Sequence, residues 1–335
     1  MRKGLLWIGK FAITLGILLY IFGKIPYSAV IDSIASANTG YILAGLSITC
    51  FIRYLESCQM KILTDHQQMS LSLSNIIEIS FVSSFYSLFL PGLLSGGVIR
   101  WYRFSRPRNK PFEALASITY WGLLDTFMLV LFGTIFMTFD ISSGVFSSAL
   151  PYLVVILSVF LLLYLLILNN FFRVHLAEKM DNGERLVVLR TVKKTIQKMI
   201  RSIVQFQDLP RRSHLLMIGL SLLGHALGVL VFYVFALSLK LDLSVMNAGW
   251  IRSFIRIITM LPVSISGFGV REGTLIIVLR NYGIDPAYAV SFSFLLFSRM
   301  LLVGLVGGIL EMKMFLYSKF RRTDGKKAED IVQRS

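Results

Sequence analysis

Two stretches of the chain, Leu90–Arg100 and Leu261–Arg271, share the pattern L-P-x-x-x-S-G-x-x-[IV]-R without a gap. Each brings proline, glycine and arginine into otherwise apolar sequence. A proline ends a helix because its ring removes a backbone N–H group, and glycines allow the chain to turn tightly. A helix that begins after such a turn presents free N–H groups and the positive end of its dipole, which favour an anion. With an arginine beside them, these features predict a site for an anion such as phosphate.

The two motifs supply the candidate binding residues, and a structural alternative remains open for each arginine. Arg100 can instead be the first of a run of basic residues that marks the cytoplasmic side of the membrane. Arg271 can instead form a local ion pair with Glu272 or with another acid. The candidate set comprises Pro91, Ser95, Gly96, Arg100, Pro262, Ser266, Gly267, Arg271 and Glu272.

The composition places these motifs in a membrane protein. Of the 335 residues, 55% are hydrophobic and only 16% are charged, and the mean hydropathy is +0.71. Long apolar runs of this kind are typical of polytopic membrane proteins. The net charge of +16 is interpreted as loop charge that sets topology and contacts anionic lipid, and not as a nucleic-acid surface. Cys50 and Cys58 lack the spacing of a disulfide framework or a metal site, so we expect ordinary buried thiols, no metal and no cofactor.

Six segments approach the length of about 20 residues that crosses a bilayer. The first has the layout of a signal sequence but no small-residue cleavage site, so we expect it to be a retained helix. Two further apolar stretches, 75–90 and 246–261, are shorter, and each runs directly into one of the motifs. The six predicted spans are roughly 5–23, 41–63, 115–138, 150–168, 214–238 and 288–312.

The Lys and Arg residues set the expected orientation. They concentrate in segment 98–113, in the linker of about 171–212 and in the tail 317–335. Under the positive-inside rule these segments and both termini are cytoplasmic, in the cytoplasmic (inner) membrane. Six crossings then leave the two short stretches as re-entrant hairpins, which enter the membrane from opposite sides.

We therefore predict an all-α polytopic membrane protein built as an inverted-topology repeat. The repeats span about 41–138 and 214–312 within a single transmembrane domain, 1–316. Apolar residues at helical spacing over about 184–208, with basic residues between them, predict an amphipathic helix in the linker. This helix either lies on the anionic leaflet or packs on the bundle. The basic tail is expected to be disordered.

Further ionisable residues fall inside the predicted membrane segments, where such residues are functional candidates by default. Arg53 and Glu56 are three residues apart on one helix and are expected either to neutralise each other or to line a pathway. Arg252 is another intramembrane charge, and His225, alone in a span, is expected to form a hydrogen bond between helices. The remaining candidates for pathway charges are Glu78, Asp125, Arg256 and Arg299.

Three stretches of the sequence resemble the lysylphosphatidylglycerol synthase transmembrane-domain family, also called flippase-like. They are LPGLLSGGVIRWYRFSR, LPVSISGFGVREG and FSRMLLVGLVGGILE, and the likeness extends from about residue 5 to 316. The second stretch is more specific than the first, through its pattern P-x-x-x-x-G-x-G-x-R-E. The first departs from the commoner family form, which has more glycine and an acidic residue before the arginine. Here Val98 and Ile99 occupy those positions.

The resemblance implies a lipid translocase that is not itself an enzyme. The family's domain is linked to moving aminoacylated phospholipid between leaflets when it is fused to a lysyl-transfer domain, and this chain is similar to the flippase portion alone. The implied ligands are anionic or aminoacylated phospholipids or polyprenyl-phosphate-linked lipids. The alternative is an enzyme of lipid or glycolipid synthesis, or an accessory to one, although the sequence holds no catalytic or nucleotide-binding pattern. A homo-oligomer and a complex with a lipid-synthesis enzyme both remain open.

Overall fold

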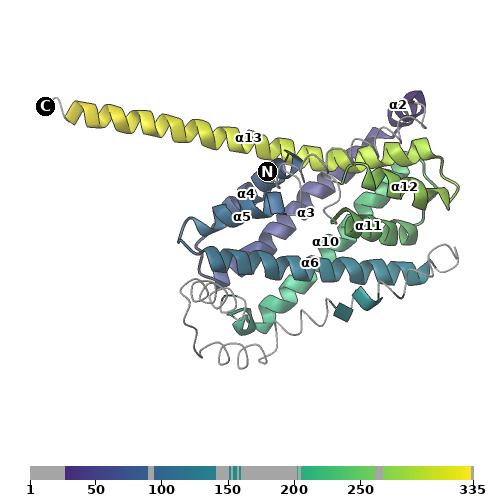
Figure 1. Cartoon of the computed structure of the whole chain (residues 1–335), viewed down its shortest axis with the longest axis horizontal. Helices are drawn as coiled ribbons and strands as arrows, with labels where there is room; N and C mark the ends of the chain where they lie inside the picture. The colour runs from purple at the N-terminus through teal and green to yellow at the C-terminus, as the bar shows by residue number, and fades with distance from the viewer. Residues whose placement is uncertain are drawn as a thin grey trace, which may run out of the picture.

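The computed structural model describes residues 27–89, 94–140, 205–260 and 267–332, together with single positions between 151 and 202. This part of the chain is helical and contains no strand (Figure 1). Its principal elements are α2 (Tyr27–Ala35), α3 (Thr39–His66), α4 (Leu73–Phe89), α5 (Leu94–Ser105), α6 (Pro111–Phe139), the 3₁₀ helix η3 (Gln205–Asp208), α10 (Arg211–Ser238), α11 (Val245–Met260), α12 (Val270–Arg280) and α13 (Pro286–Val332).

Three of the described helices are long and apolar enough to cross a membrane. They are α6, α10 and the segment Pro286–Phe315 of α13. These helices agree with the last three spans predicted within the described residues, at 115–138, 214–238 and 288–312.

The other predicted spans have different outcomes. The span predicted at 41–63 lies in α3, which meets the same criteria only when it is joined to α2 across a bend of 81°. The span predicted at 5–23 lies outside the described residues, as does most of the one predicted at 150–168. The described part of the chain therefore holds three spans, or four if α2 and α3 form one broken span.

The two short apolar stretches form helices that end where the motifs begin. α4 ends at Phe89 and α11 ends at Met260. After each motif's turn, α5 packs back against α4 and α12 packs back against α11. Each motif therefore joins a pair of short helices, as the sequence predicts. The turn residues themselves, 90–93 and 261–266, lie outside the described residues.

The helices α3 to α6 and the helices α10 to α13 make corresponding contacts. α3 packs against α10, α4 packs against α13, and α11 packs against α6. Likewise, α5 contacts α6 as α12 contacts α13, and α3 contacts α4 as α10 contacts α11. In Figure 1, α3 and α10 run diagonally through the bundle, with α6 and α13 on opposite sides of them. Each contact made by a helix of the set α3–α6 therefore has a counterpart made by the corresponding helix of the set α10–α13.

Small residues allow α13 to approach α4 closely. A Cβ atom built on Gly307 would overlap the backbone carbonyl of Phe81, and one on Gly308 would lie 2.8 Å from the ring of Phe85. In the corresponding contact between α6 and α11, a Cβ on Gly133 would lie 2.8 Å from Ser253. Small residues at helix contacts are a common way for membrane helices to pack tightly.

Glu311 of α13 connects that helix to both helices of the first pair. Its carboxylate accepts hydrogen bonds from Tyr86 Oη of α4 at 3.0 Å and from Arg103 Nη2 of α5 at 2.5 Å. The side chains of Arg103 and Glu311 also form an ion pair. Because one carboxylate reaches both helices, it holds α4 and α5 in place on α13.

Asp140, at the end of α6, plays the same part for the second pair. Its carboxylate accepts hydrogen bonds from Asn247 Nδ2 at 2.8 Å and from Trp250 Nε1 at 2.6 Å, both of α11. It also accepts one from Tyr282 Oη, just after α12, at 2.5 Å. Asp140 and Glu311 therefore each bind the short-helix pair of the other set.

The outer parts of the chain differ from expectation. α13 continues to Val332, so the prediction of a disordered tail over 321–335 is wrong for residues 321–332. Lys, Arg, Ala and Glu, all good helix formers, make up half of these residues. Cys50 is exposed and Cys58 is half-buried, so the two thiols are not buried as expected. The predicted amphipathic helix at 184–208 lies outside the described residues, apart from Ser202 and η3.

Candidate functional site

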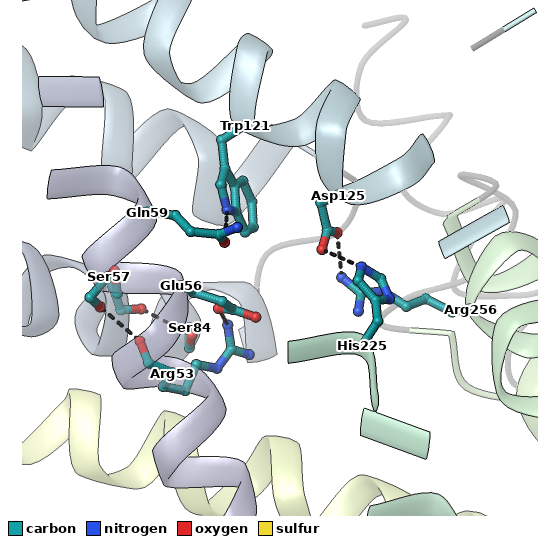
Figure 2. A network of polar contacts seen from close by, with 10 residues as sticks. Arg53, Glu56, Ser57, Gln59, Ser84, Trp121, Asp125, His225 and Arg256 are labelled. Atoms are coloured by element: carbon teal, nitrogen blue, oxygen red, sulfur yellow. Dashed lines mark hydrogen bonds and ion pairs between the residues drawn. The ribbon is translucent and has the colours of Figure 1, made fainter. Parts of the chain in front are cut away.

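Arg53 and Glu56, one turn apart on α3, form the ion pair that their spacing predicts. Arg53 Nη1 donates to Glu56 Oε2 over 2.8 Å (Figure 2). The side chains are 28% and 19% exposed, respectively. The pair therefore neutralises itself without being sealed in the protein interior.

Asp125 of α6 joins three helices through its two carboxylate oxygens. Oδ2 accepts a hydrogen bond from Arg256 Nη2 of α11 at 2.8 Å, and Oδ1 lies 3.1 Å from His225 Nε2 of α10. Figure 2 shows the ends of both side chains reaching this carboxylate. His225 thus forms the bond between helices that its isolated position in a span predicts.

Three further arginines lie near these two carboxylates but pair with neither. Arg100 and Arg252 each interact electrostatically with Glu56 and Asp125, and Arg299 interacts with Glu56. No ion pair joins any of the three to an acid among the described residues. They extend from α5, α11 and α13, so each of these helices contributes one guanidinium group without a carboxylate partner.

Arg100 lies over the ring of Trp121, with its Cζ atom 5.3 Å from the ring centroid. The indole is held in place because its Nε1 donates to Gln59 Oε1 at 3.1 Å, while Gln59 Nε2 donates to the carbonyl of Met217 at 3.0 Å. A cation–π contact of this kind orients a guanidinium group without using its N–H donors. The buried Nε of Arg100 indeed has no hydrogen-bond partner within the described structure.

Arg252 is buried at 9% exposure, and its Nη1 also lacks a hydrogen-bond partner within the described structure. Its guanidinium group lies against Gly228 of α10, where a Cβ atom would overlap Nη2 and come within 2.8 Å of Nε. His225, one turn before Gly228, likewise has an unpartnered Nδ1. Buried polar atoms without partners are uncommon in folded proteins, and several near one carboxylate are consistent with a binding role.

The charges of this region do not cancel. Its five guanidinium groups outnumber its two carboxylates by three, if His225 is counted as neutral. An unpaired arginine at the centre of a membrane helix costs about 2.5 to 3.5 kcal/mol on insertion scales. The region would therefore be stabilised by an anion. We call it the central arginine cluster, composed of Arg53, Arg100, Arg252, Arg256 and Arg299 with Glu56 and Asp125.

Arg271, unlike Arg100, has a structural partner. Its Nη2 lies 2.8 Å from Glu272 Oε1, and its Nε donates to Ser293 Oγ at 2.6 Å. Glu272 Oε2 accepts the backbone N–H of Gly269 at 2.6 Å, which caps α12. The Arg271 and Glu272 side chains are 9% and 3% exposed. The structure therefore contains the local ion pair with Glu272, one of the two roles that the sequence predicts for Arg271.

The glycine shared by the two motifs brings the helices of each pair together. A Cβ on Gly96 would lie 3.0 Å from the carbonyl of Ser83 and overlap Ser87, and one on Gly267 would lie 3.1 Å from Thr259. Gly267 also has a φ of 78°, which favours glycine. Ser95 lies in the first turn of α5, while Pro91, Pro262 and Ser266 lie outside the described residues.

Two residues of this region, Arg252 and Trp121, are not among the binding and pathway candidates predicted from the sequence. Arg252 was not placed among the pathway charges, although it lies four residues before Arg256 and so on the same face of α11. Trp121 was not singled out. Glu78 of α4 is half-buried, but no ion pair joins it to another described residue.

Residues 7–308 match the protein family described as the lysylphosphatidylglycerol synthase TM region. The chain belongs to that family. The match covers the whole central arginine cluster and confirms the resemblance seen in the sequence. No curated protein matches the chain. As a member of the lysylphosphatidylglycerol synthase TM region family, the protein is an integral membrane protein linked to lipid metabolism.

Proposed function

We propose that the protein is a lipid translocase, which moves a phospholipid or a lipid-linked phosphate between the leaflets of the membrane. The headgroup binds at the central arginine cluster while the acyl chains stay in the lipid. The observation that carries the proposal is that, over the described residues, the guanidinium groups of the central arginine cluster outnumber its carboxylates by three. Guanidinium groups bind phosphate oxygens through short, charge-assisted hydrogen bonds.

The exposure of the cluster supports a polar pathway through the bundle. Arg256 is 35% exposed and Arg53 is 28% exposed, although their charged neighbours extend from several different helices. Charged side chains at membrane depth avoid lipid and face the bundle interior or a water-filled cavity. A headgroup that enters such a cavity exchanges contacts with water for contacts with guanidinium groups.

The two helix sets, in this proposal, form an inverted-topology repeat with re-entrant motif hairpins and both termini in the cytoplasm. Their corresponding contacts support this arrangement. A second support is that Asp140 and Glu311 are separated by the same number of residues as Arg100 and Arg271, and each binds the hairpin of the other set. Transporters with inverted repeats bind substrate near the bilayer midplane and rock one repeat against the other. Such rocking would open the cluster to each side in turn.

An enzyme of lipid synthesis, or an accessory to one, is the competing function. Such a protein would also hold a lipid phosphate at the cluster, but the lipid would not need to change leaflet. Lipid movement by the purified protein alone therefore separates the two functions.

The experiment is a lipid-movement assay in liposomes, in which dithionite reduces fluorescent lipid in the outer leaflet. The wild type is compared with Arg100→Ala, which removes a guanidinium group that no carboxylate neutralises. Arg108→Ala is the matched control because it removes the same charge from an exposed turn after α5. We expect movement with the wild type and with Arg108→Ala, and a large loss with Arg100→Ala.

Two results would contradict this proposal. Unchanged movement with a folded Arg100→Ala variant would show that the cluster is not the site. No movement of anionic, aminoacylated or polyprenyl-phosphate lipid by the folded wild type would favour the enzyme or accessory function.

A further inference from the structure

The unpaired arginines also constrain the charge of the headgroup, and this inference rests on the function proposed above. Glu56 already pairs with Arg53, and Asp125 already pairs with Arg256. Neither carboxylate is therefore available to neutralise the rest of the central arginine cluster. The guanidinium groups that remain are those of Arg100, Arg252 and Arg299.

These three groups have one acidic neighbour in common, Glu56. Arg100 contacts Trp121 of α6, and Arg252 lies against Gly228, one turn after the His225 that binds Asp125 of the same helix α6. The positive charge of Arg299 also acts on Arg252. The positive charges of neighbouring guanidinium groups repel one another, and the repulsion is strongest where little water screens it. The cluster is therefore most stable with an anion among the three groups.

Unused hydrogen-bond donors show where this anion would be bound. Arg100 Nε and Arg252 Nη1 are both buried and lack partners within the described structure. Trp121 orients the first guanidinium group, and the space at Gly228 accommodates the second. Both groups are thus fixed in position with donors free, which is the arrangement expected for a preorganised phosphate site.

The candidate headgroups differ in charge. A phosphodiester such as phosphatidylglycerol carries one negative charge, and a lysyl ester of it carries a net positive charge. A phosphomonoester carries about −1.5 to −2 at pH 7, and a diphosphate carries more. Only the last two classes approach the excess of three positive charges in the cluster, and a cationic headgroup would add to the repulsion.

We propose that the central arginine cluster binds a phosphate group bearing two or more negative charges, a phosphomonoester or a diphosphate, in preference to a phosphodiester or its aminoacylated form. Arg100, Arg252 and Arg299 supply the neutralising charge. Lipids of this class are products or substrates of phosphatases and phosphotransferases, so a reaction that makes or removes a terminal phosphate must lie next to this transport step.

The test is a binding measurement with the full-length protein in nanodiscs of phosphatidylcholine. Phosphatidic acid and phosphatidylglycerol with identical acyl chains are compared at pH 8, together with lysyl-phosphatidylglycerol. We expect phosphatidic acid to bind about tenfold tighter than phosphatidylglycerol, because the additional charge interacts with arginines that form no ion pair within the described structure. Equal or tighter binding of phosphatidylglycerol or of its lysyl ester would overturn the inference.

Variants show whether the three arginines produce the preference. Arg252→Gln and Arg299→Gln should each reduce the preference for phosphatidic acid, and Arg108→Gln, at the exposed turn after α5, should leave it unchanged. Arg100→Gln should also reduce the preference. If that variant does not fold, Arg100→Lys is the milder substitution, because it keeps the positive charge but loses the planar fork of N–H donors. A preference that persists in Arg252→Gln and Arg299→Gln would also overturn the inference.

A further comparison identifies the source of the phosphate. Farnesyl diphosphate and inorganic pyrophosphate carry the same anionic group with and without an apolar chain. Tighter binding of farnesyl diphosphate supports a lipid headgroup, whereas equal binding supports the same phosphate chemistry from a soluble source. Binding of neither, with phosphatidic acid no better than phosphatidylglycerol, would refute a polyanion site.

The outcomes for this inference and for the translocase function are independent. A preference for phosphatidic acid in binding, without movement of any lipid in liposomes, would leave the charge inference standing and remove the transport function. Movement of phosphatidylglycerol that depends on Arg100, without a preference for phosphatidic acid in binding, would support the transport function and remove the charge inference.

Discussion

The guanidinium group of Arg252 lies against Gly228 where α11 packs on α10, in space that any larger residue at Gly228 would occupy. Because the end of an arginine side chain is flexible, we expect Gly228→Ala to displace the guanidinium group and not to unfold the bundle. The variant should keep its melting temperature within a few degrees, which corresponds to about 1 kcal/mol or less, and bind phosphatidic acid more weakly.

Gly224→Ala is the control for this variant. It lies one turn earlier on α10, and a Cβ there meets nothing within 4 Å. We expect it to bind lipid as the wild type does. Wild-type affinity in Gly228→Ala would show that the position of Arg252 does not matter for binding.

The Arg271–Glu272 pair should contribute strongly to stability because it is almost completely buried. Glu272→Gln leaves the buried Arg271 charge without a carboxylate to neutralise it, and we expect a loss of about 3 kcal/mol in the free energy of unfolding. Asp65→Asn, which removes the exposed ion pair between Lys61 and Asp65 on α3, should cost about 0.5 kcal/mol or less. Thermal unfolding in detergent micelles measures both, and similar shifts for the two variants would contradict the role assigned to burial.

Asp125 should stabilise the bundle most when no anionic lipid is present. Asp125→Asn removes the charge that holds Arg256 and His225, and it raises the positive excess of the cluster. We expect a destabilisation of about 3 kcal/mol in phosphatidylcholine alone, and partial recovery of the melting temperature on addition of phosphatidic acid. The exposed Asp32→Asn is the control. Lack of recovery with the anionic lipid would argue against electrostatic compensation.

The contact between α13 and α4 should tolerate no side chain at Gly307. A methyl group there would overlap the backbone carbonyl of Phe81, which cannot move without shifting α4. We expect Gly307→Ala to destabilise the protein by about 1 to 3 kcal/mol. Gly122→Ala on α6, where a Cβ meets nothing within 4 Å, should be neutral or slightly stabilising. The measurement is again thermal unfolding. A melting temperature of Gly307→Ala equal to that of the wild type would show that α13 and α4 can move apart without cost.

Local features of the fold and of the site were predictable from the sequence. Apolar runs and the proline–glycine motifs predict the helices and the two short-helix pairs, because helix formation and interruption depend on neighbouring residues. The Arg53–Glu56 and Arg271–Glu272 pairs are also local, since each joins residues within one helix. The count of six spans and the re-entrant character of the hairpins stay predictions.

The tertiary structure decided which arginines are neutralised. The sequence by itself determined that this is a helical membrane protein with charges inside its spans, and it could favour Arg271 as readily as Arg100 for binding. Helix crossings bring Asp125 to Arg256 and Trp121 to Arg100, while Ser293 supplies a further partner for Arg271. These contacts join residues far apart in the chain. These contacts form only when the helices pack in one particular arrangement, which glycines and bulky side chains at the helix contacts determine together. The spacing of residues within a single helix does not encode that arrangement.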